Sequence, residues 1–371
     1  MSTNPLSQLL PLGTSVWYDN IDRTLLKSGG LANLVKNFSV RGVTSNPSIF
    51  DKAIRGSSVY DSTIEKLNKQ GLSLEQIFEA IAIEDIAEAA DILRPVYDES
   101  GGDDGFVSIE VNPLLARKTD ETINEAVRLY EKLDRPNIMI KIPGTPEGIP
   151  AVRTCLERGI SINITLLFSV ENYVEVANTY CEALRARVAR GESVENIRSV
   201  ASFFVSRVDS AVDKRLDEIA AEKGPKWEVA SGMKGEFGII NSRLAYEQFE
   251  KIFNGDSFAD LRAAGAAVQR PLWASTSTKN PEYRDVMYVE ELIAPHTVNT
   301  MPHNTLDAFA DHGKPKAMKL DFKADNAKRD TLLELGVDIE GILTQLQIDG
   351  VRAFSESFEA LQAGIKSQID N

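Results

Sequence analysis

Short apolar or β-branched segments recur eight times along the chain, and amphipathic helical patterns separate them. Such segments are typical of strands buried on both faces, and regular alternation with helices is typical of parallel sheets. The predicted strands lie near residues 14–19, 40–45, 105–111, 137–142, 160–166, 198–206, 269–275 and 296–300.

The helical patterns between these strands carry their own start signals. One pattern begins at Ser73, where Gln76 completes a capping-box signature, and it continues through Leu93. Another begins at Ser169 and ends near Gly191. We therefore expect long helices after the second and fifth strands.

Eight strand–helix alternations predict an α/β fold, a (β/α)8 TIM barrel. The intervals 46–105 and 207–268 each hold more than one helical pattern, which indicates inserted helices instead of a second domain. We expect a single domain over residues 1–371, with the barrel at about 14–302 and a helical C-terminal extension at about 303–371.

The C-terminal extension has more helical patterns than a barrel needs, at about 304–311, 325–336 and 338–368. One of these helices could cover the mouth of the barrel. A solvated helix that coats the outer surface would show the same pattern. Both interpretations stay open from the sequence.

Composition and charge narrow the classes of function. The chain has 371 residues, of which 43% are hydrophobic and 26% charged, so it can bury a substantial core. Its 41 Lys and Arg against 55 Asp and Glu give a net charge of -14, which repels nucleic acid and anionic membranes. An anionic substrate would need local cations.

The cysteines and the first residues bear on the compartment. Cys155 and Cys181 lie in helical patterns without metal-ligand spacing, and one disulfide would be a weak reason for export, so we expect a reducing cytoplasm. Residues 1–6 lack the basic and apolar regions of a signal peptide, and no segment offers 18 consecutive apolar residues. We expect no membrane targeting.

Lys141 ends an apolar run that begins at Ile138 and precedes the turn at Pro143 and Gly144. In a strand buried on both faces, this lysine would lie inside. Burial removes hydration from an ammonium group and favours the free amine, which can attack a ketone to form a Schiff base. A lysine that ends its strand in solvent, or that pairs with a carboxylate, is the alternative for this segment alone.

Polar residues also follow the other predicted strands. Asp19 ends the first strand, Asn46 follows the second, Glu110 lies in the third, and Thr165 lies in the fifth. Singly, such residues are most often turn formers or helix caps. A barrel gathers its strand ends within about one substrate's width, so together with Lys141 they suit a polyol substrate.

Four motifs in this order resemble the transaldolases, and the similarity spans residues 14 to about 302. Segments around Ser275 and Asn299 are similar to the longer bacterial branch of that family. The motifs are Thr-Ser-Asn-Pro-Ser at 44–48, Ile-Lys-Ile-Pro at 140–143, Asn-Ile-Thr-Leu-Leu-Phe-Ser at 163–169 and Ser-Phe-Phe-Val-Ser-Arg at 202–207.

The resemblance implies a class I aldolase barrel with its Schiff-base lysine at Lys141, and no metal or organic cofactor. It implies transfer of a dihydroxyacetone unit from sedoheptulose 7-phosphate to glyceraldehyde 3-phosphate, giving erythrose 4-phosphate and fructose 6-phosphate in the pentose phosphate pathway. Phosphorylated sugars would be its partners. Whether the protein is a monomer or a homodimer stays open.

The family pattern also implies roles for the two carboxylates. Glu110 would be the acid–base group for carbinolamine formation and dehydration, acting through a water held by Thr165, and burial should raise its pKa. Asp19 would handle the proton on the hydroxyl that is released in cleavage.

Other residues of the motifs would hold the sugar. Asn46 and Asn163 would hydrogen-bond substrate hydroxyls, and Ser45 would shape the floor of the site. Purely structural roles remain open for Ser45 and Asn163.

Arg207 can present a planar fork to a phosphate, with Ser202 as an added hydroxyl donor. The family often supplies a second arginine after the seventh strand, whereas this chain continues from Ser275 to Lys279. Lys279 is the nearest cation there. It is either a second phosphate ligand or a solvated loop lysine.

Three rival functions need separate consideration. Fructose 6-phosphate aldolases use the same lysine, but they are shorter and tend to carry Tyr where this chain has Phe204, which lacks a hydroxyl proton donor. A noncatalytic sugar-phosphate binder would need only Arg207 and hydroxyl ligands. Zinc chemistry would need clustered ligands, and His296, His303 and His312 lack metal-binding spacing, so we interpret them as surface or packing residues.

Overall fold

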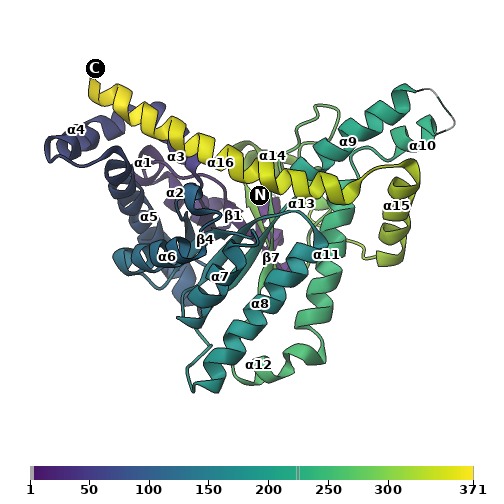
Figure 1. The fold of residues 1–371 in the computed structure, drawn as a ribbon, viewed down its shortest axis with the longest axis horizontal. Helices are drawn as coiled ribbons and strands as arrows, with labels where there is room; N and C mark the ends of the chain where they lie inside the picture. The colour runs from purple at the N-terminus through teal and green to yellow at the C-terminus, as the bar shows by residue number, and fades with distance from the viewer. Residues whose placement is uncertain (1–3, 223, 225, 371) are drawn as a thin grey trace.

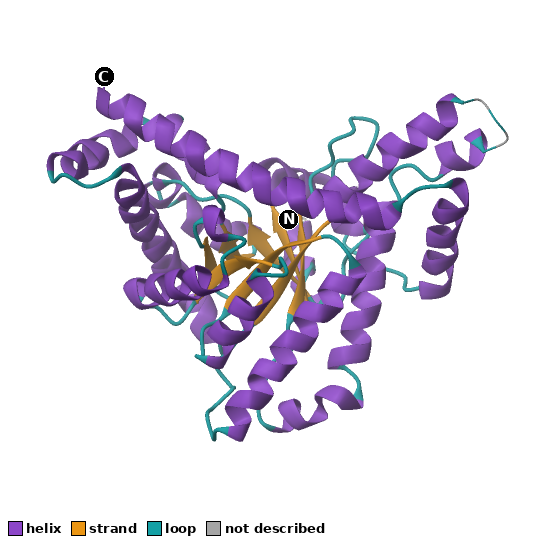
Figure 2. Cartoon of the chain, viewed as in Figure 1, coloured by secondary structure: helices purple, strands orange, loops and turns teal. Residues whose placement is uncertain are grey.

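The computed structural model describes residues 4–222, 224 and 226–370, and its strands form one closed barrel in chain order from β1 to β8. Residues 1–3, part of the segment assessed for a signal peptide, lie outside the described residues. All eight strand pairings are parallel, including that of β8 with β1. The predicted TIM barrel is confirmed (Figure 1, Figure 2).

Each predicted strand is present within two residues of its expected bounds. The strands are β1 Thr14–Tyr18, β2 Val40–Thr44, β3 Phe106–Glu110, β4 Ile138–Pro143, β5 Ile162–Leu167, β6 Ser199–Phe204, β7 Arg270–Ala274 and β8 Thr297–Met301.

The α-helices surround the barrel and extend beyond it. They are α1 Arg23–Lys27, α2 Gly30–Phe38, α3 Pro47–Arg55, α4 Asp61–Lys69, α5 Leu74–Glu99, α6 Thr119–Leu133, α7 Gly148–Glu157, α8 Val170–Ala189, α9 Ser206–Ala221, α10 Trp227–Gly232, α11 Phe237–Phe253, α12 Ala259–Ala263, α13 Met287–Glu290, α14 His303–His312, α15 Phe322–Leu335 and α16 Ile339–Asp370. Short 3-10 helices are η1 Pro5–Gln8, η2 Leu10–Leu12, η3 Ser58–Tyr60, η4 Pro113–Leu115 and η5 Asp256–Phe258. Among the helices of the described segments, none is long and apolar enough to cross a membrane.

The predicted start signals of the long helices are confirmed. Ser73 and Gln76 make both hydrogen bonds of a capping box at α5, and the Ser169 side chain caps α8. These bonds satisfy backbone N–H groups that have no partner within the first turn of a helix. The intervals 46–105 and 207–268 hold the extra helices α3–α5 and α9–α12, as expected.

Side chains from alternate strand positions fill the barrel in layers, because successive residues of a strand face opposite sides. One apolar layer includes Trp17, Phe106, Met139 and Leu272, which belong to a single buried cluster. Gly42 makes room for this layer, since a Cβ there would lie 2.5 Å from the Trp17 indole. The layer closes the barrel below the C-terminal strand ends.

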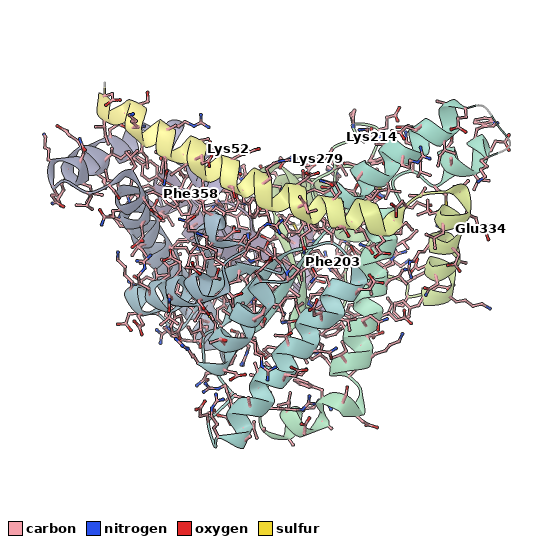
Figure 3. All side chains as sticks on the ribbon, in the orientation of Figure 1. Lys52, Phe203, Lys214, Lys279, Glu334 and Phe358 are labelled. Carbon is pink, nitrogen blue, oxygen red and sulfur yellow. The ribbon has the colours of Figure 1, made fainter. Side chains whose placement is uncertain are left out.

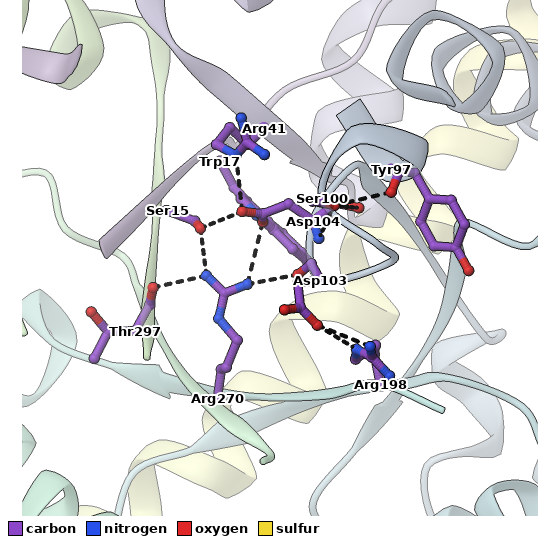
Figure 4. A network of polar contacts seen from close by, with 10 residues as sticks. All are labelled: Ser15, Trp17, Arg41, Tyr97, Ser100, Asp103, Asp104, Arg198, Arg270 and Thr297. Carbon is purple, nitrogen blue, oxygen red and sulfur yellow. Dashed lines mark hydrogen bonds and ion pairs between the residues drawn. The ribbon is translucent and has the colours of Figure 1, made fainter. Parts of the chain in front are cut away.

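The N-terminal end of the barrel is closed by a polar network around Asp104 (Figure 4). Ser15 Oγ and Trp17 Nε1 donate to its carboxylate at 2.5 and 3.0 Å, and Arg41 Nε donates at 3.0 Å. Arg270 approaches the same carboxylate at 3.3 Å and donates to Ser15 Oγ. The Asp104 carboxylate and the Arg41 and Arg270 guanidinium groups thus find partners of opposite charge within the fold.

The helix α16 crosses the C-terminal end of the barrel, which answers the question left open by the sequence. Figure 1 shows it as the long yellow helix above the strands. Its Phe354 is buried and lies over Lys141, with Nζ 5.7 Å from the ring centroid. One C-terminal helix therefore covers the mouth, and its packing on α3 and α9 supports the proposal of a single domain.

The Asp104 network predicts a large stability loss on Asp104→Ala. Asp104 is 5% exposed and Arg270 14% exposed, so the substitution strands a buried guanidinium and should destabilise the fold by roughly 3–5 kcal/mol. Urea unfolding measures the change. Asp98→Ala, which removes a solvent-exposed partner of Arg94, should leave the midpoint nearly unchanged. Equal effects of the two substitutions would contradict the prediction.

Candidate active site

A cavity of about 280 Å³ lies at the C-terminal ends of the strands, under α16. It is near the lower end of the size range of small-molecule sites. Nine residues of the sequence-predicted site line this cavity: Asp19, Asn46, Lys141, Thr165, Ser202, Phe204, Arg207, Ser275 and Lys279. The strand ends therefore converge as a barrel requires.

Lys141 is buried inside the barrel on β4, with 6% of its side chain exposed. Its register neighbours are Glu110 on β3 and Asn163 on β5. Lys141 Nζ donates to the Ser45 carbonyl at 3.1 Å and lies 3.6 Å from Glu110 Oε2. The amino group therefore faces a carboxylate and a backbone oxygen at the wall of the cavity.

Glu110 keeps both carboxylate oxygens free of hydrogen bonds to the described residues, although its side chain is only 3% exposed. Burial raises the pKa of Glu110 to about 7, and the nearby Lys141 charge opposes part of that rise. The expected rise in pKa is thus confirmed. Thr165 Oγ1 is buried and also has no partner in the described part of the chain. Thr165 lines the cavity, whereas Glu110 does not, so Glu110 faces Lys141 from behind the cavity wall.

Asp19 follows β1 and accepts a hydrogen bond from Thr44 Oγ1 at 2.6 Å. Burial raises the pKa of this carboxyl group, while the charges of Lys141, Arg207 and Lys279 pull it back down. Asp19 is therefore a second carboxylate whose proton affinity depends on the cations around the same cavity.

Besides Lys141, three cations line the cavity, and none of these three pairs with an acidic side chain of the described residues. Arg207 is the second residue of α9, and its guanidinium lies 5.0 Å from the Phe204 ring centroid. Burial lowers the pKa of Arg207. Burial also lowers the pKa of Lys279, as do the charges of Arg207 and Lys52. A phosphate dianion would neutralise most of this charge.

Lys52 is the cation that sequence reasoning missed. It lies on α3 four residues after Ser48, so both side chains share the helix face that lines the cavity. That i,i+4 spacing, just beyond the Asn46 cap, was the available signal. Figure 3 shows Lys52 and Lys279 beside α16.

Ser202 and Asn163 bond each other, which favours the structural role left open for Asn163 and changes the expectation for Ser202. Ser202 Oγ donates to Asn163 Oδ1 at 2.7 Å, so its one hydroxyl hydrogen is not directed at a phosphate. Asn163 Nδ2 donates to Ser108 Oγ at 3.0 Å, and Asn163 does not line the cavity. Because the amide is used at both ends, Asn163 braces β3 and β6 beside Lys141 and is not presented to a substrate.

The remaining predicted residues lie where they can shape or contact the site. Ser45 donates its hydroxyl to the Ser108 carbonyl and is not among the residues that line the cavity. Asn46 caps α3 through Oδ1, and its Nδ2 has no partner among the described residues. Phe204 and Phe168 pack at 5.0 Å as one wall. Ser275 Oγ lies 2.9 Å from Ser206 Oγ at the start of α9.

The histidines do not gather around a metal site. His303 and His312 have exposed side chains, at 63% and 47%, and His296 packs near Phe249. Among the described residues, no group of three or more His, Cys, Asp or Glu side chains is placed to hold a metal ion. Cys155 and Cys181 are buried free thiols in α7 and α8.

A closed (β/α)8 barrel with a buried lysine beside a carboxylate at its C-terminal strand ends is the architecture of class I aldolases. The model of the family Transaldolase/Fructose-6-phosphate aldolase matches residues 16–365. The chain therefore belongs to the transaldolase/fructose-6-phosphate aldolase family, and the resemblance seen in its motifs is confirmed.

Similar proteins share this chain over almost its whole length. The Transaldolase of Trichodesmium erythraeum is 44% identical, over 100% of this chain and 98% of the relative. The Transaldolase of Frankia alni is 46% identical, over 99% and 98%. That of Mycolicibacterium smegmatis is 43% identical, over 100% and 99%.

The environment of Glu110 predicts a pH dependence. Because its pKa is about 7, the carboxylate that accepts protons is lost as the pH falls through 7, and kcat/KM should fall on that acid side. Glu110→Gln should lower kcat by about 10²- to 10⁴-fold and abolish the inflection. Steady-state assays across this pH range measure both effects. A Gln variant that keeps the inflection would exclude Glu110 as its source.

Proposed function

We propose that this protein is a transaldolase that transfers a dihydroxyacetone unit through a Schiff base on Lys141. Its donor would be sedoheptulose 7-phosphate and its acceptor glyceraldehyde 3-phosphate, giving erythrose 4-phosphate and fructose 6-phosphate in the non-oxidative pentose phosphate pathway. The observation that carries the proposal is the buried Lys141 amine, 3.6 Å from a carboxylate whose oxygens have no other partner among the described residues.

A buried lysine suits this reaction because its amine can form an imine with the ketone of the substrate. Cleavage of a carbon–carbon bond near a carbonyl needs an electron sink, and a protonated imine supplies one. The Lys141 amine adds to the ketone carbon to give a carbinolamine, and the Glu110 carboxylate accepts the proton released from nitrogen through a water held by Thr165. Glu110 then returns that proton to the departing hydroxyl, and one water molecule leaves as the imine forms. This chemistry requires no metal or organic cofactor.

Asp19 is placed for the cleavage step. Its carboxylate accepts the proton of the substrate hydroxyl that becomes the aldehyde, and the electron pair of the broken bond enters the imine to form an enamine. The first aldose phosphate then leaves. The enamine adds to the incoming aldehyde while Asp19 returns the proton to the new hydroxyl, and hydrolysis of the imine frees Lys141.

The cation cluster supports phosphorylated sugars as substrates. The chain carries a net charge of -14, so long-range attraction cannot bring an anion to it. Arg207, Lys279 and Lys52 supply local positive charge at the cavity without acidic partners in the described segments. We propose that they bind the phosphate groups of both donor and acceptor, and that the protein acts in the cytoplasm.

Transfer is favoured over aldolase activity by Phe204. A Tyr at this position would place a hydroxyl near the enamine carbon, where it could donate a proton and release free dihydroxyacetone. Phe204 packs on Phe168 and below Arg207, so it fills that wall without a donor. The full-length similarity to proteins named Transaldolase supports the same choice.

Removal of the lysine tests the chemistry. Lys141→Ala should abolish turnover because no other residue forms the imine, and borohydride with fructose 6-phosphate should trap an adduct on wild type but not on the variant. Circular dichroism checks that the variant folds, and Lys36→Ala, on the exterior helix α2, serves as the matched control. Appreciable activity in folded Lys141→Ala protein would refute the Schiff-base mechanism.

Acceptor dependence separates transfer from the two alternatives. With fructose 6-phosphate and erythrose 4-phosphate, a transaldolase releases more than one equivalent of glyceraldehyde 3-phosphate per enzyme only when the acceptor is present. Continued turnover without the acceptor would identify an aldolase. Folded protein that neither releases product nor traps substrate would be a sugar-phosphate binder.

The phosphate cations predict a graded effect on KM. Arg207→Ala removes a half-buried charge-assisted contact and should raise KM for phosphorylated donors by about 10- to 100-fold. Lys52 is exposed, so Lys52→Ala should raise KM by only about 2- to 10-fold. Comparison with unphosphorylated sugars is the control. If both kinds of sugar respond alike, these residues do not bind phosphate.

A further inference from the structure

Leu166 has a strained backbone immediately after Thr165. Its φ is 60°, in the left-handed region, where a bulky side chain costs about 1–2 kcal/mol. The pairing of β5 with β6 is irregular between Ile164 and Leu167, so the strain coincides with a bulge. Such a conformation persists only where its surroundings hold it.

The side chain that holds this bulge comes from α16. Gln347 Nε2 donates to the Leu166 carbonyl at 3.1 Å and to the Gly144 carbonyl at 3.1 Å. It also lies 3.0 Å from Asn172 Oδ1, and Asn172 Nδ2 donates to the same Gly144 carbonyl. One amide group thus joins the ends of two strands and the first turn of α8.

These two strands carry the groups that the proposed mechanism uses. Gly144 lies three residues after Lys141, and Leu166 directly follows Thr165. Gly144 N donates to the Thr165 carbonyl at 2.7 Å, so the ends of β4 and β5 are joined there by backbone as well. Gln347 adds a side-chain link between Leu166 of β5 and Gly144, which follows β4.

One face of α16 makes all of these contacts. Gly350 follows Gln347 by three residues, and a Cβ there would lie 2.9 Å from Leu166 Cδ2. Phe354 follows by seven residues and covers Lys141 Nζ. Because residues three, four and seven apart share a helix face, α16 contacts the strained bulge and the lysine together.

We propose that Gln347 is a positioning residue that fixes the Thr165 hydroxyl relative to Lys141, and that α16 is therefore part of the active site and more than its cover. This inference rests on the roles of Lys141 and Thr165 in the proposed function. Loss of the Gln347 bonds would let the bulge relax and move Thr165 relative to the forming imine, and displacements of about 1 Å can lower rates about 100-fold.

Gln347→Met tests the inference because it keeps the length of the side chain and removes the donor. We expect kcat to fall about 10- to 100-fold with less than about a 2-fold change in donor KM. The single-turnover rate of borohydride-trappable imine formation should fall in parallel with kcat. A merely structural role would lower the melting temperature and leave these rates unchanged in folded protein.

Two further variants complete the test. Gln345→Met removes an amide that donates to the half-exposed Asp349 one turn further along α16, so its rates should match wild type. Gly350→Ala presses a methyl group against Leu166 from the same helix face, and it should slow imine formation even if Gln347→Met does not fold.

The outcomes separate this inference from the proposed function. Suppose that wild type traps an adduct. If folded Gln347→Met traps it equally fast, Gln347 is not a positioning residue. If Gln347→Met cannot be purified, an unchanged rate in Gly350→Ala leads to the same conclusion. If wild type itself traps no adduct, the Schiff-base function is wrong, and the role of Gln347 is refuted with it.

Discussion

The enclosure of Lys141 and Glu110 as a close pair of opposite charges is the constraint on which the site depends. Their separation of 3.6 Å follows from register, because they are direct neighbours on β4 and β3. Burial disfavours the ionised carboxylate and raises its pKa to about 7, while the lysine charge limits that rise. The Glu110 carboxyl group can therefore gain or lose a proton near neutral pH.

The two ends of the barrel differ in how the buried polar groups described above are hydrogen-bonded. At the N-terminal end, Asp104 receives donors from Ser15, Trp17 and Arg41, so the network is satisfied and stabilises closure. At the C-terminal end, Glu110 and Thr165 keep buried oxygens without partners in the described residues. Unpaired polar groups disfavour folding, and these two lie beside Lys141, where a water or a substrate could supply the missing bonds.

Charge is divided in a similar way between the whole molecule and the cavity. The net charge of -14 favours solubility and repels anions, yet Arg207, Lys279 and Lys52 remain without acidic partners in the described segments beside the mouth. Mutual repulsion among these cations is tolerable because a phosphate would relieve it. Phe354 and α16 add an apolar cover that strengthens such local interactions by excluding water.

The sequence alone determined the eight strands and the helix starts at Ser73 and Ser169, because both depend on local patterns of residues. It also determined the convergence of Asp19, Glu110 and Lys141, since parallel strands in a barrel end on the same side. Tertiary structure alone decided that α16 covers the mouth, that Lys52 joins the cations, and that Ser202 and Asn163 bond each other. Those outcomes depend on contacts between residues far apart in the chain, and a helical period shows which face is apolar without showing what that face will cover.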